Sequence, residues 1–250
     1  YHTAFLDGAD LNFSKTGNYM RDIGFQYVEG QESPFYDGEE RYSFKSVSDD
    51  VLYNRVLDYN KNAQQPYFET IITVTTHQPY TDPISNERNI EKAVKFADQA
   101  LYDFYVKLEA EGFFENGLLL VTSDHRAMTP IFEAEIKRFG TQALSKVPMI
   151  VIGDEFIDRG TQEEFVQQSD LLNSLEYFTS EQHCSRQGEG NLFSEPVKAS
   201  TCIYHNRGDY RDRIDVFCNN GAHYAQVQLK GDKTKVISGE LPDEESVIRF

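Results

Sequence analysis

Three residues at two distant places in the sequence have the chemistry of a metal or acid–base site. His77 follows one apolar run, and Asp124 and His125 follow another. A carboxylate and a neutral imidazole are usual ligands of Zn²⁺ or Mn²⁺. A histidine can also bind an anionic oxygen or protonate a leaving group. An Asp-His dipeptide supplies two ligands, so such a site needs at least one or two more.

Simpler interpretations of the same residues stay open at this point. The Asp124-His125 dipeptide could be a solvated pair in a loop, and His77 could be a turn histidine packed on the proline and tyrosine that follow it. The remaining histidines lie outside any comparable pattern, and we interpret them as structural or exposed; they are His2, His183, His205 and His223.

Predicted strands place these residues at the same edge of a sheet. Residues 67–75 are nearly continuous in apolar and β-branched character and predict a buried strand that leads into His77. Residues 118–122 predict a second buried strand, which ends at Asp124 and His125. In an open α/β sheet, ligands gather outside the carboxyl ends of the strands. If the strands are parallel, His77 and the Asp-His pair can converge there.

The pattern between these strands predicts an α/β fold. A helix over residues 88–111 has apolar residues at steps of three and four, and Gly112 is suited to end it. The other predicted elements are a short strand or turn and then a helix within 1–30, a surface loop over 30–46, a helix over 48–60, a strand over 147–152 and a helix over 169–177. Helices between strands indicate a doubly wound, mostly parallel sheet with helices on both faces.

The pattern changes near Cys184. Short segments over 213–217, 223–229 and 234–238 are separated by Asn-Gly and Gly-Asp turns, which is typical of antiparallel strands. We therefore predict an α/β catalytic part over residues 1–183 and a small β-rich appendage over 184–250.

Composition limits the classes of function. The 250 residues are 39% hydrophobic, which is enough for a core, and the formal charge of −17 makes nucleic acid a poor partner. A divalent metal would still allow an anionic substrate, because it inverts the local field. No apolar run reaches the 18 residues typical of a membrane span, and no signal peptide is recognisable. The first residue is Tyr1, so we expect a processed form or part of a longer chain.

Cysteine usage leaves two alternatives open. Cys184, Cys202 and Cys218 have no CxxC spacing, which argues against a zinc–thiolate site. In an oxidising compartment they could form one disulfide and one free thiol, and otherwise three unpaired thiols. GxSxG, P-loop and GxGxxG motifs do not occur. A glycosidase carboxylate pair has no specific signal in so acidic a chain.

An ordered set of motifs resembles one family. TTHQPY, a helix containing EKAVKFADQALYDFY, then GLLLVTSDH, KVPMIVIG and QQSDLLNSLEYF follow one another over roughly residues 4–180. Upstream, FLDGADLNFSKTGNYMRDIGF and SVSDDVLYNRVLDY agree with the same pattern. Together they resemble the C-terminal half of the sulfatase-type catalytic domain of lipoteichoic acid synthases and bacterial phosphoglycerol transferases, in the alkaline phosphatase superfamily.

The resemblance implies roles for particular residues. Asp124 and His125 would be ligands of one divalent metal ion, which is manganese, magnesium or zinc in such proteins. His77 would contact the transferred phosphate group, and Asp10 would be a substrate-binding acid. The family's nucleophile is a Thr or Ser that attacks phosphorus; we find no match for it and expect it upstream of Tyr1.

The sequence departs from the family pattern at three positions. Arg126 stands where the family has Gly or an aromatic residue, and could add a contact to an anionic substrate. Ser14 and Thr16 stand at about the sequence positions where the synthases have the aromatic residue and the arginine that line their glycerol-phosphate pocket.

The resemblance implies an enzyme that transfers or hydrolyses phosphoryl groups of the phosphoglycerol type. Its substrate would be a lipid head-group or glycan phosphoester outside the cytoplasm, at the extracytoplasmic face of a bacterial inner membrane or in the periplasm. We expect a membrane anchor in the full-length protein and little activity from this chain alone. The alternatives are a sulfatase, that is, a sulfuric ester hydrolase, and a non-catalytic ligand-binding remnant of the same fold.

Overall fold

The computed structural model describes residues 1–156, 160–179, 190–194, 201–206, 210–231 and 233–242. The chain forms two compact units. The first comprises residues 1–120 and 151–155, and the second comprises 121–150 and 156–250. The predicted boundary at residue 184 lies outside the described residues and stays a prediction.

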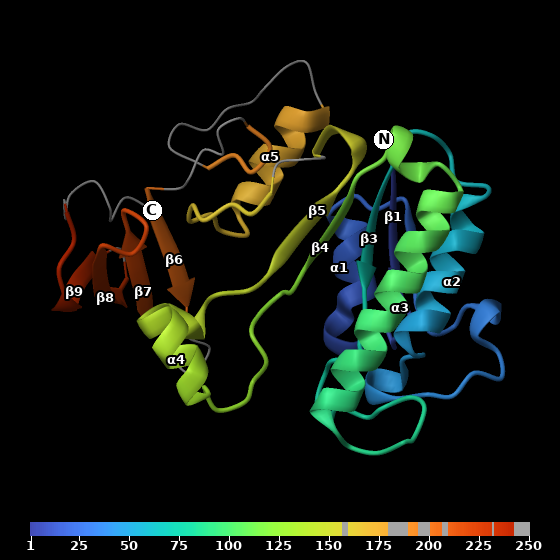
Figure 1. The fold of residues 1–250 in the computed structure, drawn as a ribbon, viewed down its shortest axis with the longest axis horizontal. Coiled ribbons are helices and arrows are strands. Elements are labelled where there is room, and N and C mark those ends of the chain that lie inside the picture. The colour runs from blue at the N-terminus through green and yellow to red at the C-terminus, as the bar shows by residue number, and fades with distance from the viewer. Residues whose placement is uncertain (157–159, 180–189, 195–200, 207–209, 232, 243–250) are drawn as a thin grey trace. The chain divides into compact units, whose positions relative to one another are not determined.

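The first unit is built on a parallel sheet. Its elements are β1 (His2–Asp7), α1 (Thr16–Asp22), β2 (Tyr27–Glu29), α2 (Asp49–Asn60), β3 (Tyr67–Ile72) and α3 (Ile90–Ala110). The strands lie in the order β2-β1-β3, and β1 is parallel to both neighbours. Figure 1 shows α2 and α3 on one side of this sheet and α1 on the other. The prediction of an α/β fold with a parallel sheet and helices on both faces is confirmed.

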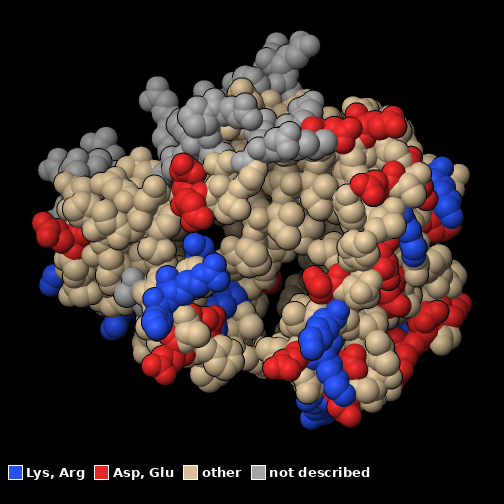
Figure 2. All heavy atoms as spheres, in the orientation of Figure 1, with Lys and Arg blue, Asp and Glu red and all other residues tan. Residues whose placement is uncertain are grey.

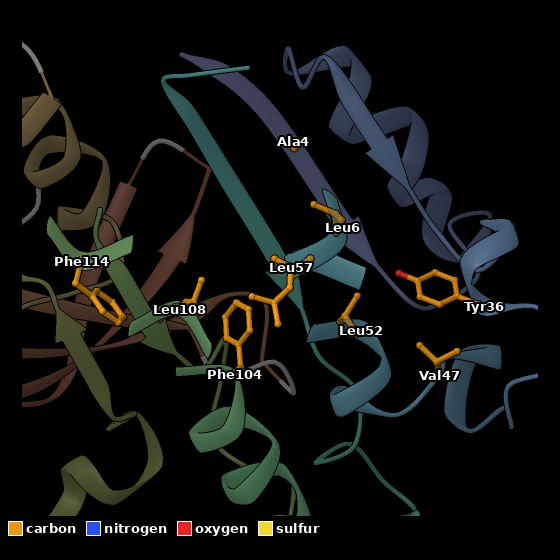
Figure 3. Packing of buried hydrophobic residues seen from close by; sticks show 10 residues of the cluster. Ala4, Leu6, Tyr36, Val47, Leu52, Leu57, Phe104, Leu108 and Phe114 are labelled. Carbon is orange, nitrogen blue, oxygen red and sulfur yellow. The ribbon is translucent and has the colours of Figure 1, made fainter. Parts of the chain in front are cut away.

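Alternation along β1 explains how helices can cover both faces. Ala4 and Leu6 are fully buried and join a core with α2 and α3, to which Leu52, Leu57, Phe104 and Leu108 contribute. Figure 3 shows these side chains gathered between the strand and the two helices. Phe5 points to the opposite face, where its ring lies 6.0 Å from that of Phe25, just after α1. Successive strand residues face opposite ways, so both faces of β1 are buried.

The ends of the helices follow from local chemistry. The side chain of Asn89 accepts a hydrogen bond from the backbone nitrogen of Lys92 and so caps the start of α3. Gly112 adopts φ +70° just beyond its end, as predicted for a stop signal. Helix α2 begins with two acidic residues, Asp49 and Asp50, which complement the positive end of the helix dipole.

Strand β3 is shorter and less buried than the sequence predicts. It ends at Ile72 instead of residue 75, and Phe68 and Ile72 are 37% and 39% exposed. Pairing stops at Ile72 because its partner strand β1 ends at Asp7, and beyond it the backbone N–H groups of Val74 and Thr75 donate to the side chain of Asp49. The second predicted strand is likewise only partly buried as β4 (Leu119–Thr122), and it shares a two-stranded sheet with β5 (Met149–Ile152).

The second unit carries a separate antiparallel sheet. Its strands are β6 (Cys202–Asn206), β7 (Arg213–Cys218), β8 (His223–Lys230) and β9 (Lys233–Gly239), in that order. The unit also contains α4 (Glu133–Phe139) and α5 (Asp170–Thr179). The predicted strands over 213–217, 223–229 and 234–238 are confirmed as β7, β8 and β9. Among the described helices, none combines the length and apolar character needed to cross a bilayer.

A disulfide joins the first two strands of this sheet. Cys202 and Cys218 are directly paired across β6 and β7, and their sulfur atoms are bonded. Both residues are buried in the small core of the sheet. This decides between the two alternatives for these cysteines, while Cys184 lies outside the described residues.

Candidate active site

His77 lies in a tight turn just beyond the carboxyl end of β3. Its backbone nitrogen donates to the carbonyl of Val74 at 2.8 Å, and its carbonyl accepts from Tyr80 at 2.9 Å. Its ring nitrogen Nδ1 lies 2.6 Å from the carbonyl oxygen of Gln78, so Nδ1 carries the proton and donates. In the neutral ring Nε2 is therefore the acceptor, and in the charged ring it is a second donor.

Asp49 fixes the turn that carries His77. One oxygen of its carboxylate accepts from the backbone nitrogens of Val74 and Thr75, at 3.0 and 2.9 Å. In return, the hydroxyl of Thr75 accepts from the backbone nitrogen of Asp49 at 3.2 Å. Asp49 is 2% exposed, and burial raises the pKa of its carboxyl group although these hydrogen bonds oppose the shift. The start of α2 is thus tied to the end of β3.

Asp10 lies beyond the carboxyl end of β1 and is paired with a lysine. Its carboxylate accepts from the ammonium of Lys45 at 2.8 Å, and from the backbone and side chain of Asn12. The hydrogen bond from Lys45, with further ones from Asn12, lowers the pKa of Asp10 to about 2. The Lys45 side chain is 68% exposed, so its ammonium stays accessible to solvent.

The turn over residues 43–45 brings Asp10 and His77 to one place. The backbone nitrogen of Asp10 donates to the carbonyl of Phe44 at 2.9 Å, and the Phe44 ring meets the His77 ring edge-on, 4.7 Å between centroids. The hydroxyl of Ser43 donates to the carbonyl of Gln78 at 3.1 Å. Two predicted site residues therefore share one surface of the first unit.

Backbone conformations near this surface are unusual. Phe44 and Lys45 both have positive φ, at 57° and 61°, and so do Ser14 and Lys15, at 50° and 59°. The rings of Phe13 and Phe44 lie 4.6 Å apart, so the two strained turns touch. Non-glycine residues in this region cost on the order of 1 kcal/mol or more each and cluster at functional sites.

Asp124 and His125 lie in the loop after β4, and their side chains point to solvent. The exposed fractions of the two side chains are 85% and 54%. Oδ2 of Asp124 lies 3.4 Å from Nε2 of His125. Two ligands of a tetrahedral ion, each about 2.1 Å from it, are about 3.4 Å apart. The spacing therefore suits two ligands of one metal ion.

The other ring nitrogen of His125 is also arranged as a metal site requires. Nδ1 lies 2.7 Å from the carbonyl oxygen of Arg126, which fixes the proton on Nδ1 and leaves the Nε2 lone pair available. Metal-binding histidines usually donate their second N–H to such an acceptor. Among the described residues, no group of three His, Cys, Asp or Glu is placed to hold a metal ion. The pair supplies only part of a coordination shell.

Arg126 is engaged by its own loop. Its guanidinium forms a bidentate pair with Glu135 on α4, at 3.1 and 2.6 Å, and donates to the carbonyls of Ala127 and Thr129. Its side chain is 14% exposed. The pair with Arg126 lowers the pKa of Glu135. A contact between Arg126 and an anionic substrate stays a prediction, and would require this guanidinium to leave Glu135.

The predicted site residues thus fall into two groups. Asp10 and His77 meet in the first unit, and Asp124, His125 and Arg126 share one loop in the second. The convergence of the two groups, which the sequence predicts, stays a prediction.

Sequence reasoning missed three residues around Asp10 and His77. Phe44 and Lys45 lie in a stretch that reads only as a surface loop, and Asp49 reads as a charge at a helix start. The sequence carries no signal that Asp49 is buried. Its burial, and the backbone donors that a buried acid needs, come from packing against the end of β3.

Comparison with known proteins gives a consistent result. The family model named Sulfatase matches residues 1–176. Phosphoglycerol transferase I from Xanthomonas euvesicatoria pv. vesicatoria is 25% identical over 145 residues, 51% of this chain and 20% of that protein. Lipoteichoic acid synthase 1 from Bacillus subtilis is 22% identical over 173 residues, 60% of this chain and 27% of that protein. The chain thus spans about a fifth to a quarter of these relatives.

Solved structures share the fold. The lipoteichoic acid synthase LtaP from Listeria monocytogenes superposes with a TM-score of 0.69 at 17% identity, covering 99% of this chain and 66% of that one. An alkaline phosphatase superfamily protein from Vibrio parahaemolyticus superposes with a TM-score of 0.63 at 20% identity, covering 99% of this chain and 62% of that one. The family model covers well over half of the sequence, and the motif order, fold and relatives agree with it. The chain belongs to the sulfatase family.

Proposed function

We propose that this chain is part of a metal-dependent phosphoryl transferase or hydrolase of the phosphoglycerol type. Its substrate would be a lipid head-group or glycan phosphoester outside the cytoplasm. The observation that carries the proposal is the pair formed by Asp124 and His125, whose ligand atoms are spaced for one divalent ion. The names of the relatives, phosphoglycerol transferase and lipoteichoic acid synthase, support the substrate class.

The residues of the chain have separate tasks in this proposal. Asp124 and His125 would hold manganese, magnesium or zinc, which when bound neutralises charge on the phosphoryl oxygens and lowers the pKa of a coordinated hydroxyl. His77 offers Nε2 to a phosphoryl oxygen or to the leaving group, with its ring held by Gln78 and Phe44. Asp10 would bind a hydroxyl of the substrate, which requires it to share or release Lys45.

An extracytoplasmic location belongs to the same proposal. The disulfide between Cys202 and Cys218 supports it, because such bonds persist in oxidising compartments and are rare in the cytosol.

The test is metal retention and turnover by the full-length protein with a chromogenic phosphodiester. Asp124→Ala is expected to abolish metal retention and turnover together, because half of the described ligand pair is lost. Asp98→Asn, an exposed change on α3, is the matched control for loss of one negative charge. Unchanged metal content and turnover in Asp124→Ala would refute the assignment.

Two alternatives predict different results in that assay. A sulfatase would hydrolyse a chromogenic sulfate ester in preference to the phosphodiester. A non-catalytic remnant would bind metal and phosphate through the same residues and turn over neither ester.

A further inference from the structure

Gln168 lies against the loop that carries Asp124 and His125. Its side-chain nitrogen donates to the carbonyl oxygens of Ser123 at 2.6 Å and of Asp124 at 3.1 Å. An amide nitrogen has two N–H groups, so both hydrogen bonds can form at once. One side chain thus holds two successive peptide groups, 44 and 45 residues away in sequence.

The segment that carries Gln168 is itself anchored. The backbone nitrogen of Gln167 donates to a carboxylate oxygen of Asp170 at 2.9 Å, at the start of α5, and Asp170 is completely buried. The side-chain oxygen of Gln167 accepts from the backbone nitrogen of Tyr204 in β6 at 3.3 Å. The backbone nitrogen of Phe165 donates to the side chain of Asn220 at 3.0 Å.

These contacts connect the antiparallel sheet of the second unit to the loop after β4. Tyr204 lies in β6, and Asn220 lies in the turn between β7 and β8. The sheet therefore supports residues 165–168 and, through Gln168, the backbone of Asp124.

Such support matters because the two candidate ligands are oriented by the backbone of their own loop. Both side chains are more than half exposed, and their hydrogen bonds run from the His125 ring to the carbonyl of Arg126 and from the His125 backbone nitrogen to Asp124. The spacing of Oδ2 and Nε2 then depends on the backbone at residues 124 and 125. Holding that backbone reduces the conformational entropy lost when a metal binds.

We infer that Gln168 is a positioning residue, which holds the Asp124-His125 loop in the conformation that binds a divalent metal. This inference rests on the proposed function, since it requires Asp124 and His125 to be ligands. It adds a task for the β6–β9 sheet that neither the family nor the relatives' names assign.

The test is a titration of this chain and of the full-length protein with Mn²⁺. Binding is measured as the loss of the electron paramagnetic resonance signal of free Mn²⁺. Gln168→Met keeps the length of the side chain and removes both donors. We expect Mn²⁺ affinity to fall about ten- to a hundred-fold, the usual effect of losing a residue that orients metal ligands. In the full-length protein, turnover should return at saturating Mn²⁺, because the ligands themselves remain.

Two further variants isolate the donor function. Gln168→Asn retains both amide N–H donors without adding charge, on a side chain one methylene shorter, and is expected to bind Mn²⁺ more tightly than Gln168→Met. Gln99→Met removes an amide that donates to Asp103 within α3, and should bind like the wild type. Near-ultraviolet circular dichroism of each variant shows whether the fold is kept, so lost packing is separated from lost positioning.

The possible results separate this inference from the proposed function. If Asp124→Ala abolishes binding while folded Gln168→Met binds Mn²⁺ like the wild type, the positioning role is overturned and the metal site stands. If Asp124→Ala leaves binding unchanged, the metal site is wrong, and the positioning role fails with it.

Discussion

At the scale of single residues, the chemistry of this chain depends on how each ionisable group is hydrogen-bonded. His77 and His125 both direct Nδ1 to a neighbouring backbone carbonyl, which leaves the Nε2 lone pair of the neutral ring available. Asp10 is held as a carboxylate by Lys45, while Asp49 is buried and used for backbone contacts. Residue type alone does not distinguish these tasks. Asp10 and Asp49 are both aspartates near strand ends, and only their surroundings differ.

Asp7 provides a prediction about pH. It ends β1 and is 7% exposed, and burial raises its pKa from 3.8 to about 6, although it accepts a hydrogen bond from the backbone of Ala9. The folded chain therefore holds this proton more tightly than the unfolded chain does. Its contribution to stability is present below about pH 4 and is lost as pH rises through about 6, for a total of about 3 kcal/mol at most.

Asp7→Asn should remove that loss of stability. The amide is neutral at every pH and its oxygen can still accept from Ala9, so the free energy of unfolding should exceed that of the wild type at pH 7 and match it near pH 4. Urea unfolding at several pH values measures the difference, with Asp98→Asn as the exposed control. Equal pH profiles for Asp7→Asn and the wild type would contradict the raised pKa.

At the scale of elements, the link between α2 and the end of β3 positions His77. Asp49→Ala leaves the buried N–H groups of Val74 and Thr75 without this acceptor, at a cost of about 1–3 kcal/mol for each. We expect a lower midpoint of urea unfolding and a displaced His77 ring resonance in proton–carbon NMR spectra. Asp49→Asn keeps one acceptor oxygen and should show much smaller changes. A His77 resonance that is unmoved in Asp49→Ala would show that Asp49 does not position His77.

The elements that sequence predicted well are those with strong periodicity. Helix α3 has a long amphipathic pattern with an asparagine cap and a glycine stop, and its observed bounds differ little from those predicted. Strands β2 and β6 and helix α4 were missed. β2 has three residues and α4 has seven, which are too few for a period to be recognised. β6 depends on its partner β7 in the sheet, which no local pattern reveals.

At the scale of the whole molecule, net charge affects the binding of an anionic substrate, and a disulfide affects stability. Figure 2 shows acidic side chains spread over the face in view and basic ones gathered in a few clusters. This agrees with the formal charge of −17. On such a surface an anionic substrate needs local positive charge, and exposed Lys45 beside Asp10 is one source of it.

The disulfide allows a prediction for the second unit. Cys202 and Cys218 are 16 residues apart, and closing a loop of that size stabilises a protein by about 3 kcal/mol in the chain-entropy model. Paired serine substitutions at both positions should lower the free energy of unfolding by about that amount. Reduction of the wild-type chain should lower the free energy of unfolding by a similar amount and leave that of the paired serine variant nearly unchanged. Thiol titration of the unreduced, denatured chain should find one free thiol, and three would show that the bond is absent.

The sequence by itself determined the family, the α/β class and which residue types could bind metal and phosphate. Those features are encoded in motif order and in the periods of strands and helices, which are local. Only the tertiary structure decided which groups surround them. Asp49 with the His77 turn, Phe44 with His77, and Gln168 with the Asp124 loop join residues 25 to 45 positions apart. Such pairings depend on how packed elements meet in space, and a local pattern does not record that.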